Sequence, residues 1–221
     1  MTGSPAALFA ALLALTVLAG AVTALSTRDA RLAVLGLLVA LLAGPFVADP
    51  LPDMRGIAAR LAGAVLVAYP LLIAIRWSSE PTTTGSSGGW PADALLALTA
   101  AVAAGAAAAG WDVAGRLGAG DGPGAGIGLA EGSELTVLFL PAIAAGTGVL
   151  TLAASAIAFG RDPLRLTVGL CLAILGLTIV QAGLGGPPSA FTDLCVAVLL
   201  ATTAGGGAML TRASHLDERS T

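Results

Sequence analysis

Long apolar stretches separated by short polar segments make up most of this chain. They lie near residues 5–25, 29–48, 57–76, 93–110, 135–158, 164–184 and 190–211. A helix of about 20 apolar residues crosses a hydrocarbon core of roughly 30 Å. Only helices or closed barrels satisfy every backbone polar group in lipid, and these stretches lack the apolar/polar alternation of barrel strands. The pattern therefore predicts an all-α, polytopic transmembrane helical bundle of about seven spans.

The composition fits a chain that is solvated mainly by lipid. Hydrophobic residues make up 57% of it and charged residues 10%, whereas soluble domains carry roughly 25% charged residues. The net charge of -3 argues against nucleic acid as a partner, because binding phosphates requires a basic surface. All ten basic residues are arginine, which together with abundant alanine and glycine indicates a GC-rich bacterial genome. We expect the chain in the bacterial plasma membrane.

Residues that could carry chemistry are scarce. Cys171 and Cys195 lie in apolar stretches with no histidine close by, so we expect neither a zinc site nor a disulfide. The Gly-rich segments at 77–91 and 118–132 fit neither phosphate-binding glycine motif. The chain shows no Ser/His/Asp set and no cluster of metal ligands. We therefore expect no catalytic residue, no metal site and no cofactor bound by this chain.

The distribution of arginine predicts the orientation in the membrane, because short cytoplasmic loops retain positive charge. If the loop at 28–31 is cytoplasmic, alternate crossings leave three arginines outside: Arg55, Arg60 and Arg116. The other seven are then inside: Arg28, Arg31, Arg76, Arg161, Arg165, Arg212 and Arg219. This predicts an external N-terminus and a cytoplasmic C-terminus.

One sequence segment occurs twice. Residues 28–37, RDARLAVLGL, are similar to residues 161–170, RDPLRLTVGL, and the two copies start 133 positions apart. In each copy the next span is followed by a Pro-bearing loop and a third span that ends in arginine. We therefore expect two parallel three-helix repeats, at 1–76 and 135–221, the second including a cytoplasmic tail. Residues 77–134 would supply a polar loop, one connecting transmembrane helix at 93–110 and a Gly-rich loop.

Short motifs in this chain resemble a known family of membrane subunits. They are Arg161, Leu164 and Arg165, followed by Gly169-Leu170-Cys171-Leu172 and Gly176, together with Thr192-Asp193 and Pro70-Leu71. A three-helix unit of this kind resembles the K subunit of respiratory complex I. The duplicated form resembles component E of hydrogenase-4 and of the formate hydrogenlyase membrane arm.

The resemblance implies a function within a larger complex. It implies a non-catalytic integral membrane subunit of a complex-I-related oxidoreductase, in the arm that translocates protons or cations. Its partners would be antiporter-like and other membrane subunits, and the iron-sulfur or nickel-iron centres would belong to partner subunits. The alternatives are a stand-alone small-solute transporter and a membrane anchor or assembly protein.

The chain departs from that family at a position important for proton transfer. The family carries a membrane-embedded glutamate in the second helix of each K-like unit, and an intramembrane carboxylate is typical of proton paths. Here residues 173–176 read Ala-Ile-Leu-Gly, and the first unit has Leu41 near the equivalent place. Where the family tends to have a lysine, residues 63–65 read Gly-Ala-Val. These departures favour a structural connector within the arm.

A few polar or unusual residues within the spans are candidates for function. Asp193 is either part of a proton or ion path or an acid favoured by the positive end of its helix. Gln181 is either a hydrogen-bonding contact between helices or part of the same path. Tyr69 and Pro70 mark a possible kink or cavity, because proline frees a backbone carbonyl. Four loop arginines serve as topology anchors or dock a partner: Arg28, Arg31, Arg161 and Arg165.

Overall fold

The computed structural model is a bundle of long helices. It describes residues 5–27, 29–48, 54–77, 99–100, 102–106, 133–159, 162–185 and 190–218. The long helices are α1 (Pro5–Ser26), α2 (Ala30–Ala48), α3 (Met54–Trp77), α5 (Ser133–Phe159), α6 (Pro163–Gly185) and α7 (Ala190–Glu218). The predicted helices at these six places are confirmed, most with boundaries shifted by no more than a few residues.

Among the described residues, five helices are long and apolar enough to cross a membrane. Their apolar segments are Leu8–Ser26, Ala30–Val47, Leu140–Ala158, Pro163–Leu184 and Phe191–Ala213. Helix α3 is not one of these five, but it contains 24 residues and packs along α7. The chain is therefore a helical membrane protein.

Two helices begin with the same local structure. The Asp29 carboxylate accepts a hydrogen bond from the backbone N–H of Arg31 at 2.9 Å, and the Asp162 carboxylate accepts one from Leu164 at 3.0 Å. Each aspartate thus caps the orphan N–H groups at a helix start, one at α2 and the other at α6. Donor and acceptor are each 133 positions further along in the second case.

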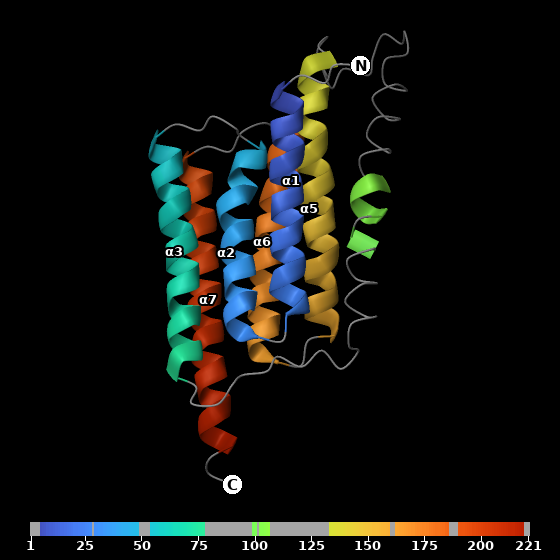
Figure 1. Cartoon of the computed structure of the whole chain (residues 1–221). Coiled ribbons are helices and arrows are strands. Elements are labelled where there is room, and N and C mark those ends of the chain that lie inside the picture. The colour runs from blue at the N-terminus through green and yellow to red at the C-terminus, as the bar shows by residue number, and fades with distance from the viewer. Residues whose placement is uncertain are drawn as a thin grey trace, which may run out of the picture.

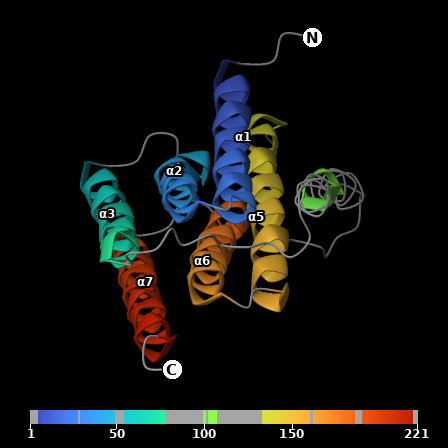
Figure 2. The same cartoon turned by 60° about the horizontal axis from the view of Figure 1, so that its bottom comes forward.

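The helices form two layers, as Figure 1 and Figure 2 show. One layer contains α1, α2 and α3, and the other contains α5, α6 and α7 in the same order. Helix α1 packs against α5, α2 against α6 and α3 against α7. The two members of each pair run in the same direction (Figure 1). The two layers therefore pack face to face, with each helix parallel to its partner in the other layer.

The chain must pass from one end of the bundle to the other between α3 and α5. Helix α3 ends at the end of the bundle opposite to where α5 begins (Figure 1). Residues 99–100 and 102–106 in this connection are helical, and a Cβ on Gly148 of α5 would lie 3.3 Å from the carbonyl oxygen of Ala100. A connecting span at 93–110 would provide this passage, and its remaining residues lie outside the described ranges.

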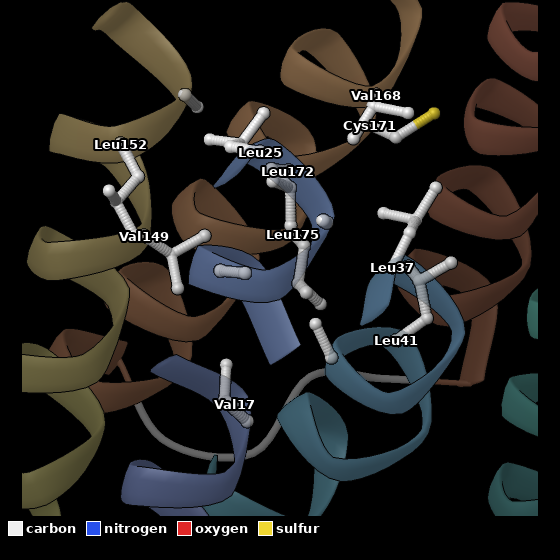
Figure 3. Close-up of a cluster of buried hydrophobic side chains, with 14 of the residues drawn as sticks. Val17, Leu25, Leu37, Leu41, Val149, Leu152, Val168, Cys171, Leu172 and Leu175 are labelled. Atoms are coloured by element: carbon white, nitrogen blue, oxygen red, sulfur yellow. The ribbon is translucent and has the colours of Figure 1, made fainter. Parts of the chain in front are cut away.

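The core lies between the two layers and consists of aliphatic side chains with many small residues. Figure 3 shows part of it, with Val17, Leu25, Leu37, Leu41, Val149, Leu152, Val168, Cys171, Leu172 and Leu175 labelled. Helices α1 and α2 approach closely at Gly20 and Gly36, where a Cβ on Gly36 would lie 2.8 Å from the Gly20 carbonyl oxygen. Lipid offers no hydrophobic driving force between helices, so close packing through small residues stabilises such a bundle.

Candidate functional site

An ion pair joins α3 to α7 inside the bundle. The Nε of Arg60 donates to Oδ2 of Asp193 at 3.2 Å, and the two side chains are 8% and 12% exposed. Arg60 lies in the second turn of α3, and Asp193 lies in the first turn of α7. Isolated charges are costly in apolar surroundings, so each side chain offsets the charge of the other.

The ends of two helices stabilise these charges further. The Nη1 of Arg60 donates to the backbone carbonyl of Pro45 at 3.4 Å. Pro45 lies in the last turn of α2, where carbonyl groups have no partner within the helix and the helix dipole is negative. Asp193 lies at the positive end of α7. The guanidinium therefore bridges a negative helix end and a carboxylate.

A small cavity lies beside the ion pair, between α2, α3, α6 and α7. Its volume is about 60 Å³. The lining residues are Leu41, Gly44, Pro45, Arg60, Gly63, Ala64, Leu175, Thr178, Ile179, Ala182, Asp193, Val196, Ala197 and Leu200. A water molecule needs roughly 10–15 Å³ of such space, whereas small-molecule pockets typically measure about 300–1,000 Å³. The cavity has room for a few water molecules or one small ion.

The lining of this cavity is mostly apolar. Its polar side chains are Arg60, Asp193 and Thr178. The Thr178 hydroxyl donates to the Ile174 carbonyl at 2.6 Å, so its oxygen can still accept a hydrogen bond. The described helices carry no group of three His, Cys, Asp or Glu residues that could hold a metal ion. The polar groups described at this site are thus the ion pair and the Thr178 hydroxyl.

The structure separates the other predicted candidates from Asp193. Gln181 lies on the exposed side of α6. Tyr69 is 64% exposed, and Pro70, within α3, is half-buried. None of these three lines the cavity beside the ion pair. They are therefore not brought together with Asp193 into one polar path in the described part of the chain.

The two described loop arginines have different surroundings. Arg165 reaches across to α1, where its Nη2 donates to the Leu25 carbonyl at 2.8 Å. That carbonyl belongs to the last turn of α1, so the contact neutralises a helix end. Arg31 is exposed. Arg28 and Arg161 lie outside the described residues.

Glycines in α7 have two kinds of environment. A Cβ on Gly207 would overlap the side chain of Thr167 in α6, whereas Gly205 and Gly206 have nothing within 4 Å of a Cβ. Gly207 therefore serves the internal packing of the bundle. Both cysteines are free, with Cys171 buried and Cys195 exposed.

The sequence alone did not single out Arg60 as the partner of Asp193, because it was counted only as an external loop arginine. One signal could have found it. Arg60 and Asp193 are 133 positions apart, the same spacing that relates the two copies of the repeated segment. If the two segments descend from one repeated unit, residues at this spacing occupy equivalent places and are candidates for contact.

Comparison with protein-family models, with curated proteins and with solved structures finds no match to this chain.

Proposed function

We propose that this chain is a non-catalytic membrane subunit of a complex-I-related oxidoreductase of the membrane-bound hydrogenase type. The observation that carries the proposal is the stacking of two three-helix layers with the same order and direction. It is the arrangement expected of two K-like units fused in one chain. The motifs at 161–176 and 192–193 supply the link to that family.

Matching residues in the two layers support a duplication. The caps at Asp29 and Asp162 have the same geometry and are 133 positions apart. A contact between helices recurs at the same spacing: a Cβ on Gly36 would lie 2.8 Å from the carbonyl oxygen of Gly20, and one on Gly169 would lie 3.5 Å from that of Ala153. Each layer would then descend from one ancestral three-helix unit.

Within such a complex the chain would act as a connector in the ion-translocating arm. Its one carboxylate in the apolar part of the described spans, Asp193, is paired with Arg60. A neutralised pair of this kind holds helices together more readily than it relays protons, because releasing either charge leaves the other unpaired. Redox centres and the principal ion path would belong to partner subunits.

The described cavities give little support to a stand-alone transporter. A transporter binds its solute in a cavity at the interface of its repeats, where a few polar groups fix the solute. The cavity beside the ion pair measures only about 60 Å³, and a second hollow of about 350 Å³ between α3 and α7 is lined by apolar residues and one threonine, Thr202. A connector requires no such cavity.

The proposed location is the bacterial plasma membrane, with the N-terminus outside and the C-terminus in the cytoplasm. Arginine counting supports this orientation. The Arg60–Asp193 pair would then lie toward the outer surface, because α7 begins three residues before Asp193.

Purification from native membranes in a mild detergent tests the proposal. Mass spectrometry of co-purifying proteins should find antiporter-like subunits together with iron-sulfur or nickel-iron partners. Recovery of the chain alone would overturn it.

The connector role has a separate test in the same preparation. Asp193→Asn should leave the complex assembled and its ion translocation within about twofold of native, because the amide oxygen can still accept from Arg60. Ala182→Ser, which adds a hydroxyl in the same cavity and leaves both charges in place, serves as the control. Intact assembly with a large loss of translocation in the Asn variant alone would refute the connector role.

A further inference from the structure

The ion pair joins equivalent places in the two layers. Arg60 precedes Asp193 by 133 positions, the spacing that also relates the helix caps at Asp29 and Asp162. The residues that follow agree as well. Residues 61–68 read LAGAVLVA and residues 194–201 read LCVAVLLA. Arg60 and Asp193 thus carry opposite charges at equivalent positions, although the residues that follow them are similar.

The cavity beside the ion pair is also lined by pairs of residues that are 133 positions apart. Pro45 and Thr178 line it at the 133 spacing, and so do Ala64 and Ala197. Helices α3 and α7 both turn this face toward α2 and α6, so the two charged side chains meet in the space between the layers. Arg60 and Asp193, which occupy the same position in the two units, thus share one mostly apolar cavity.

Identical units could not stack in this way. Two copies of the first unit would bring Arg60 against another Arg60, and two copies of the second would bring Asp193 against another Asp193. Like charges in a largely buried contact repel strongly, because solvent screens them little. Parallel stacking of identical units is otherwise open-ended, because each layer exposes a face like the one its neighbour has used.

We infer that the Arg60–Asp193 pair is the specificity determinant that makes the first three-helix unit stack on the second unit and not on a second copy of itself. The kind of partner that this surface accepts is a K-like unit of opposite charge at the equivalent position. The inference rests on the two-unit architecture of the proposed function. It adds the rule by which units recognise one another.

Disulfide formation in the full-length chain provides the test. A Cβ on Gly63 would lie 3.1 Å from the Cβ of Ala197, close to the roughly 3.5–4.5 Å of disulfides. The substitutions G63C and A197C, in a chain whose two native cysteines are replaced by alanine, therefore report stacking. The native charges should give an efficient intrachain disulfide. So should the exchanged pair R60D/D193R, whereas R60D alone and D193R alone should each form it at least about tenfold more slowly.

Co-expression distinguishes recognition between units from mere stability. One tagged chain carries R60D and G63C, and a second, differently tagged chain carries D193R and A197C. The first unit of one chain and the second unit of the other then have opposite charges, so a disulfide between chains should form. Two chains with native charges and the same cysteines should form at least about tenfold less of it.

The inference is wrong if the single variants crosslink within the chain as fast as native, or if R60D/D193R fails to recover the disulfide. It is also wrong if co-expression does not enrich the interchain product. A failure of the oxidoreductase proposal would appear in the co-purified proteins and would leave these crosslinks unchanged.

Discussion

The Arg60–Asp193 pair should contribute more to stability than an exposed ion pair. The side chains are 8% and 12% exposed and 3.2 Å apart, and removing one partner of a buried pair typically costs about 3–5 kcal/mol. Asp193 lies three residues into α7, roughly 5 Å from its start at 1.5 Å per residue, so some access to the interface lowers this cost. We expect Asp193→Leu to destabilise by about 3 kcal/mol.

Arg60→Leu should cost less, about 2 kcal/mol, because the remaining carboxylate still faces the positive end of α7. The double variant Arg60→Leu/Asp193→Leu leaves no unpaired charge, but it loses the bond to the Pro45 carbonyl. We expect about 2 kcal/mol for it, and hence a coupling free energy of about 3 kcal/mol between the two side chains.

Unfolding in mixed micelles titrated with a denaturing detergent measures these free energies for all four chains. Tyr69→Leu, on the exposed side of α3, should change stability by less than about 0.5 kcal/mol and serves as the control. A coupling free energy below about 0.5 kcal/mol would refute the reasoning, because that is the value of a solvent-screened surface pair.

Two further predictions concern contacts between helices. Gly36→Ala should destabilise by about 1–3 kcal/mol, because its Cβ would lie 2.6 Å from a backbone nitrogen of α1 and only a shift of the helices could relieve the overlap. In the same unfolding assay the control Gly206→Ala, whose Cβ would have nothing within 4 Å, should be neutral or slightly stabilising. Equal effects of the two substitutions would contradict the close packing of α1 and α2. Arg165→Ala should lower stability by about 1.5–3 kcal/mol, because it removes a charged hydrogen bond to α1. Arg31→Ala, at an exposed position, should lower it by less than about 0.5 kcal/mol. Similar melting temperatures for these two variants would show that the bond between the helices is not formed.

The hydropathy pattern was sufficient to predict the long helices because a membrane helix satisfies its backbone polar groups within itself. The residues of each span are therefore sufficient to determine that it is helical. The same holds for the helix starts at α2 and α6, where Asp29 and Asp162 bond to N–H groups two residues away. Predicted boundaries such as 29–48 and 164–184 consequently agree with the helices within one residue.

The sequence also contained the spacing of 133 that relates the two segments, and with it the hypothesis of a duplication. It did not contain the lateral order of the helices, because hydrophobic surfaces in lipid have no preferred neighbour and association depends on close packing of particular faces. Only the tertiary structure decided that α3 lies against α7. The contact between α3 and α7 gives Asp193 a charged partner, Arg60, whereas the sequence showed only an acid near a helix start.

The candidate site shows the same division. Asp193 was selected from the sequence because a carboxylate within an apolar span is costly, and that argument needs no knowledge of its surroundings. The identity of its partner and the separation of Gln181 from the cavity depend on which helix faces meet, over a distance of 133 residues for the ion pair. Local sequence thus determined the helices and the cost of the charge, and only the packing of helices determined how that charge is neutralised.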